Sequence, residues 1–167
     1  MKPYFLIIAL LLTMLQGCSQ NSEKKIRKQV TAVAEKYIMS QLNDAKKTAL
    51  KDGTIIYSNE LKKYVIDQSK IFTGLIDDDQ DIDAIITLST YDKQFQTVSE
   101  QLVILKVDDE FKLAASLESD MRIISLKDRI ITADVPEHSR STPLFDCPSC
   151  WEVVKFRYMM GELVKAQ

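Results

Sequence analysis

The chain has 167 residues, of which 46% are hydrophobic and 28% are charged, with four Gly and four Pro. This composition is typical of a globular domain and excludes a low-complexity or collagen-like chain. The 22 basic and 24 acidic side chains give a formal charge of −2, which excludes a general nucleic-acid binder.

The N-terminus carries the pattern of an export signal. Lys2 supplies a positive start, residues 5–15 are an apolar run of 11 residues, and the small residue Gly17 precedes Cys18. A membrane-spanning helix needs about 20 apolar residues, so this run is too short to be one. We therefore expect residues 1–17 to be a signal peptide.

The end of this segment, Leu15-Gln16-Gly17-Cys18, resembles the lipobox of bacterial lipoproteins. The resemblance implies that Cys18 receives diacylglycerol on its sulfur, that the signal is cut before it, and that the new N-terminus is acylated. Residues 18–23 then form the lipidated cysteine and a short tether, and several acyl chains anchor a protein stably. Ser19, directly after this cysteine, resembles the residue found there in lipoproteins sorted to the outer membrane. This resemblance implies that the chain is held at the periplasmic face of that membrane. The alternative is a secreted protein with an incidental cysteine.

Two helices are predicted in the first half of the chain. Residues 22–51 form an amphipathic pattern because apolar residues recur three and four positions apart. Gly53 follows as a candidate C-cap. A second, short helix is predicted over residues 61–66, begun by the capping side chain of Ser58 or Asn59.

The start of the first helix is basic. Such a cluster close to a lipid anchor indicates contact with anionic headgroups, and the alternative is a solvated first turn. The residues concerned are Lys24, Lys25, Arg27 and Lys28.

The second half of the chain changes to the alternating pattern of β-strands, joined by short polar turns that connect antiparallel neighbours. We therefore expect an α+β fold in a single domain over residues 24–167. In it the amphipathic helix and the short helix pack on an antiparallel meander of six to seven strands. The predicted strands are 82–90, 101–107, 111–117, 121–126, 129–135, 152–158 and 163–165.

An acidic turn with five Asp over residues 77–83 precedes the first of these strands. Carboxylates this close repel one another unless water or a cation neutralises them. Four of them alternate, as oxygen ligands do in calcium loops. The pattern resembles the loops of FG-GAP-type repeats, except that Gln80 replaces the turn glycine and Leu75 the first ligand. It therefore predicts either a weak Ca²⁺ site or a solvated turn without a cofactor. The alternating residues are Asp77, Asp79, Asp81 and Asp83.

Cys147-Pro148-Ser149-Cys150 has three interpretations. A disulfide is typical of exported proteins, because they enter an oxidising compartment. The motif also resembles the dithiol of thioredoxin-like proteins, but those place the first cysteine at a helix N-terminus, and here a loop precedes and a strand follows. A zinc site would need two further ligands, from His138 and Asp146 or Glu137. We expect the disulfide, with a periplasmic thiol-redox or metal-binding factor as the alternative.

No catalytic constellation is visible, since His138 stands alone and no glycine-rich phosphate loop occurs. Residues 75–167 resemble a family of bacterial lipoproteins of uncharacterised function, a resemblance that implies no activity. We therefore expect a non-enzymatic binding or accessory domain, held to the membrane by its lipid, whose partner is an envelope protein or polymer. The motifs of the resemblance are Asp83-Ala84-Ile85-Ile86, Thr142-Pro143, the Cys147–Cys150 segment, Phe156-Arg157-Tyr158 and Gly161-Glu162-Leu163.

Overall fold

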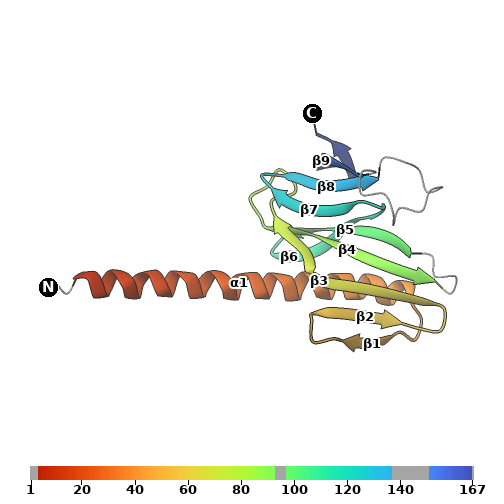
Figure 1. Cartoon of the computed structure of the whole chain (residues 1–167), viewed down its shortest axis with the longest axis horizontal. Coiled ribbons are helices and arrows are strands. Elements are labelled where there is room, and N and C mark those ends of the chain that lie inside the picture. The colour runs from red at the N-terminus through yellow and green to blue at the C-terminus, as the bar shows by residue number, and fades with distance from the viewer. Residues whose placement is uncertain (1–3, 93–96, 137–150, 167) are drawn as a thin grey trace.

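The computed structural model describes the backbone of residues 4–92, 97–136 and 151–166, and the side chains of residues 22–92, 98–136 and 151–166. Within these ranges it contains one helix and ten strands (Figure 1). The elements are α1 (Tyr4–Gln41), β1 (Lys46–Ala49), β2 (Thr54–Ser58), β3 (Lys62–Gly74), β4 (Asp83–Asp92), β5 (Thr97–Val107), β6 (Glu110–Glu118), β7 (Arg122–Lys127), β8 (Ile130–Pro136), β9 (Trp151–Met159) and β10 (Glu162–Lys165).

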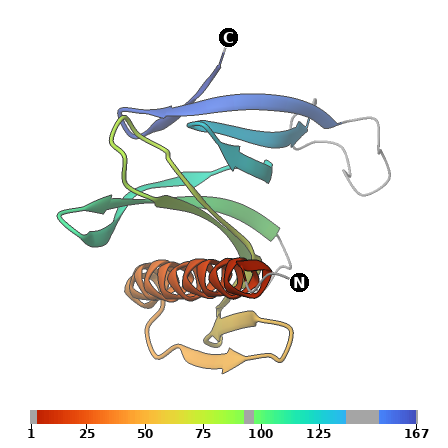
Figure 2. The same ribbon diagram turned by 90° about the vertical axis from the view of Figure 1, so that its left-hand side faces the viewer.

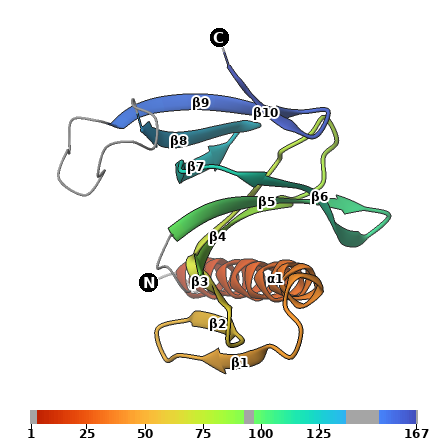
Figure 3. The ribbon, with the colours of Figure 1, turned by 90° about the vertical axis from the view of Figure 1, so that its right-hand side faces the viewer.

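The strands form two antiparallel sheets. One has six strands in the order β1-β2-β3-β4-β5-β6, and the other has four in the order β10-β9-β8-β7. The six-stranded sheet curls around α1, with β1 and β2 on one side of the helix and β4 and β5 on the other (Figures 2 and 3). The predicted α+β fold with antiparallel strands is confirmed, but the described residues form ten strands in two sheets rather than six to seven in one meander.

The first core lies between α1 and the six-stranded sheet. Val30, Ala34 and Ile38 follow one another at steps of four on the helix and are fully buried. They pack with apolar side chains of β2 to β5. Arg27, from the predicted basic cluster, donates to the backbone carbonyls of Gln68 (2.9 Å) and Ile71 (3.0 Å). Its guanidinium therefore bonds the irregular middle of β3 and is not simply solvated.

The second core lies between the two sheets. On β4 the side chain of Ile85 enters this core, whereas those of Ala84 and Ile86 enter the first core. The start of β4 is therefore covered on both faces, which explains its unbroken apolar run. From the four-stranded sheet, Ile131 and Phe156 fill the same space.

The predicted helix over residues 22–51 ends ten residues too late. Helix α1 stops at Gln41, and residues 46–49 are strand β1. Asp44 adopts a left-handed conformation (φ 56°), which reverses the chain and lets β1 pair with β2. All four side chains of β1 are exposed, so the strand has no alternating apolar pattern to reveal it.

The predicted short helix over residues 61–66 is wrong, because these residues belong to the β2–β3 hairpin. The Asn59 side chain accepts hydrogen bonds from the backbone N–H groups of Leu61 and Lys62, both at 2.9 Å. This is the chemistry of a helix N-cap, but here it closes a turn between two strands. In contrast, each of the seven strands predicted between residues 82 and 165 is present, with ends shifted by no more than four residues.

Candidate functional site

The acidic turn (residues 77–83) connects β3 to β4, and its last residue, Asp83, is the best anchored. The Asp83 side chain is fully buried. One carboxylate oxygen accepts a hydrogen bond from the backbone N–H of Ile76, and the other accepts one from the backbone N–H of Lys106, both at 2.9 Å. Asp83 therefore ties the turn to the start of β4 and to the end of β5.

The earlier residues of the turn curl back on themselves. The Asp77 carboxylate accepts from the backbone N–H of Asp79 (3.0 Å), and the Asp79 carboxylate accepts from that of Asp81 (2.8 Å). As a result, one carboxylate oxygen from each of Asp77, Asp79 and Asp83 lies within 4.8 Å of the others. Three of the four predicted calcium ligands are brought together.

Asp81, the fourth predicted ligand, lies outside this group. Its carboxylate pairs with the ammonium of Lys106 at 3.0 Å, and Lys106 also pairs with Asp109 at 2.9 Å. Asp109 and Asp81, in that order of effect, raise the pKa of Lys106. One lysine thus bridges the acidic turn and the β5–β6 turn.

Burial makes the ionised form of the turn costly. It raises the pKa of Asp83, although backbone N–H donors, those of Lys106 and Ile76 foremost, act in the opposite direction. It also raises the pKa of Asp77, with further contributions from Asp79 and Asp78. A cation among these carboxylates would offset this cost, and hard oxygen ligands are those that Ca²⁺ prefers. Because Ca²⁺ takes six to eight oxygens, three carboxylates leave about half of its shell to water, which fits a weak site.

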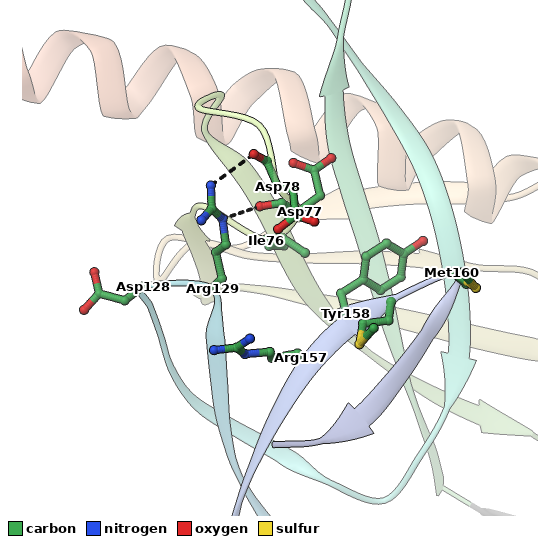
Figure 4. Close-up of a pocket in the computed structure, with 9 residues that line it drawn as sticks. Ile76, Asp77, Asp78, Asp128, Arg129, Arg157, Tyr158 and Met160 are labelled. Carbon is green, nitrogen blue, oxygen red and sulfur yellow. Dashed lines mark hydrogen bonds between the residues drawn. The ribbon is translucent and has the colours of Figure 1, made fainter. Parts of the chain in front are cut away.

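Arg129, from the four-stranded sheet, binds the backbone of the acidic turn. It lies in the β7–β8 turn, in a left-handed conformation (φ 62°). Its guanidinium donates to the backbone carbonyls of Asp77 (2.5 Å), Asp78 (3.1 Å) and Asp79 (3.0 Å), as Figure 4 shows for the first two. Sequence analysis missed this contact. A charged residue in a two-residue turn does not indicate which distant loop it reaches.

A cavity of about 420 Å³ separates the acidic turn from the β9–β10 hairpin (Figure 4). The acidic turn and Arg129 form one wall, and Arg157, Tyr158 and the fully exposed Met160 form the other. A second cavity of about 380 Å³ shares Arg157 and Met159 with the first. The two cavities therefore lie on either side of Arg157 and Met159.

Arg157 and Met159 belong to the face of the four-stranded sheet that points away from the second core, which we name the outer face. On β9, Val153, Lys155, Arg157 and Met159 alternate with the buried Val154 and Phe156. Val153 is 62% exposed and Met159 55%. A solvated sheet face is normally polar, so apolar side chains here are informative. We define the outer face by the exposed residues Val153, Lys155, Arg157, Met159 and Val164, beside which Asp134 and Glu162 lie on the neighbouring strands.

The cysteines add no geometry to the site. Cys147, Cys150 and His138 lie outside the described residues, and Cys18 belongs to the backbone of α1 but its side chain is outside them too. In the part of the chain that the structure describes, no helix is long and apolar enough to cross a membrane.

Comparison with known proteins gives no relationship: no family model, no curated protein and no solved structure matches this chain.

Proposed function

We propose that this protein is a lipid-anchored lipoprotein of the bacterial cell envelope, with a non-enzymatic binding or accessory domain. The lipid is attached at Cys18 and holds the chain to the periplasmic face of the outer membrane. The support for the anchor is the order of Lys2, the apolar run, Gly17 and Cys18 in the sequence.

The course of α1 is consistent with this anchor. The N-terminal part of the helix extends beyond both sheets (Figure 1), and the first fully buried side chain of the helix among the described residues is Val30. A helix rises 1.5 Å per residue, so about 18 Å separate Cys18 from Val30. A lipid at Cys18 would therefore keep the folded domain close to the membrane surface.

The outer face is the observation that supports a binding domain. The outer face presents apolar side chains to solvent, whereas the side chains on the other face of the same sheet pack in the second core. Exposed apolar side chains gathered on one face are typical of surfaces that another molecule covers. We therefore assign partner binding to this face, with an envelope protein or polymer as the partner.

Lipid labelling tests the anchor. In a Gram-negative host grown with radioactive palmitate, wild type and Cys147→Ala should be labelled and should fractionate with the outer membrane. Cys18→Ala should carry no label and should keep its signal peptide, because the modified sulfur is missing. Label on Cys18→Ala, or none on wild type, would contradict the proposal.

A second candidate function is weak calcium binding at the acidic turn, favoured by the convergence of Asp77, Asp79 and Asp83. At 10 mM Ca²⁺ and a Kd of about 1 mM, binding would stabilise the fold by about 1.4 kcal/mol, a rise in Tm of about 3–6 °C. Asp79→Asn should lose this rise. Asp78→Asn is the matched control, because it removes the same charge from the same turn outside the convergent group. Equal rises in both variants, or none in wild type, would exclude this site.

A further inference from the structure

We propose that the outer face binds an acidic segment of a partner protein. Carboxylates of the segment pair with Lys155 and Arg157, and its apolar side chains cover Val153, Met159 and Val164. This inference rests on the proposed binding function and adds the chemistry of the partner to it.

The arrangement of the cations supports an extended segment. Lys155 and Arg157 are two residues apart on β9, so their side chains leave the same face about 7 Å apart. Alternate side chains of an extended peptide have the same spacing. Apolar residues flank the two cations along the strand, Val153 on one side and Met159 on the other. A segment with two alternate carboxylates between apolar residues matches this order.

The charges of the outer face are available to a partner. In the described part of the chain, Lys155 and Arg157 have no carboxylate within ion-pair distance. In contrast, Lys106 pairs with two aspartates, and Lys47 with one glutamate. The nearest carboxylates along the register are peripheral, since Asp134 lies opposite Val153 and Glu162 opposite Met159. Lys155 and Arg157 therefore lie between these two carboxylates, and at the Val153 end Arg122, opposite Asp134, lies over the Trp151 ring.

The position of the face favours a protein over the membrane. The four-stranded sheet and α1 lie on opposite sides of β4 and β5 (Figures 2 and 3). The proposed anchor lies in the N-terminal part of α1, which extends beyond both sheets (Figure 1), so a membrane at that end leaves the outer face open to the periplasm. A pair of close cations also needs a ligand with close anionic groups, and neighbouring carboxylates of an acidic segment supply them.

Peptide selection tests the inference. The full-length lipidated chain, held in a zwitterionic detergent, is immobilised and exposed to a display library of random 12-residue peptides. Selected peptides should contain at least two Asp or Glu next to apolar residues. They should bind Arg157→Glu and Lys155→Glu at least tenfold more weakly than wild type. Arg157→Lys should retain most binding, and Lys36→Glu, the same charge reversal on α1, should retain all of it. Unchanged Tm values show that these exposed substitutions leave the fold intact.

The variant Val153→Asn separates the two proposals, because it removes an apolar contact and keeps the charge. Peptides that are not acidic but bind Val153→Asn more weakly would overturn the acidic partner and leave the binding face standing. Peptides insensitive to every substitution on the face, or no selected peptide, would overturn both. Stronger Arg157-dependent binding to phosphatidylglycerol vesicles than to any peptide would identify the membrane as the occupant. Arg157-dependent self-association would identify a second copy of the chain, and either result would refute the inference.

Discussion

Asp83→Asn should destabilise the fold more than any other single-atom exchange in the acidic turn. Asn has the shape of Asp, but one of its two terminal groups donates hydrogen bonds and cannot accept them. Asp83 uses both oxygens as acceptors, one for Ile76 N–H and one for Lys106 N–H. The variant can therefore satisfy one of these donors, and its own amide faces the other.

The magnitude follows from the two bonds. Losing one charge-assisted hydrogen bond costs about 1.5–3 kcal/mol, and a buried N–H left without an acceptor costs about 1–3 kcal/mol. Removing a buried charge returns part of this, because burial disfavours the ionised Asp83. We expect a net loss of about 2–4 kcal/mol in the free energy of unfolding.

Urea denaturation followed by circular dichroism measures this loss, with Asp78→Asn as the control. The exposed control should change stability by less than about 0.5 kcal/mol. Hydrogen exchange should also accelerate at the Ile76 or the Lys106 amide. A loss for Asp83→Asn no larger than that of the control would refute the assignment of Asp83 as the residue that holds the turn.

Three further predictions concern other parts of the chain. Ile38→Ala should lower the free energy of unfolding by about 2–5 kcal/mol in urea titration, against little change for the half-exposed Met39→Ala. Burial, with a nearby glutamate carboxylate, raises the pKa of Tyr37 to about 12, so ultraviolet titration should show a phenol ionising near pH 12, and Tyr37→Phe should remove that step. Because this pKa is raised, its contribution to stability is full below pH 10 and is lost as the pH rises through 12. Thiol counting should find no free thiol before reduction and two afterwards, from Cys147 and Cys150, and two free thiols before reduction would contradict the disulfide.

The strands from residue 82 onwards were predictable because their signals are local. Several of them alternate apolar and polar side chains, and the two-residue turns of the β5–β6, β7–β8 and β9–β10 hairpins favour antiparallel pairing. The first three strands were not predictable in the same way. Strand β1 is exposed throughout, and Asn59 performs the same capping chemistry in a hairpin turn as it would at a helix start. When the same local interaction fits both a helix start and a hairpin turn, the packing of the flanking segments decides which of the two forms.

In the candidate site, too, some features follow from the sequence and others depend on contacts with distant residues. The spacing of the aspartates predicts either a weak Ca²⁺ site or a solvated turn, and Asp77, Asp79 and Asp83 converge. The exclusion of Asp81 depends on Lys106, which comes from a neighbouring strand in the sheet. The brace from Arg129 depends on the stacking of the second sheet over the first.

The sequence by itself determined the existence of most strands, and it is the whole basis of the proposed export signal and of the proposed anchor at Cys18, because these depend on residues that are neighbours along the chain. The tertiary structure decided how the strands divide into two sheets, which aspartates meet, and which sheet face is left open. These features arise from contacts between segments far apart in sequence. Their energies come from burial and packing, which no local pattern records.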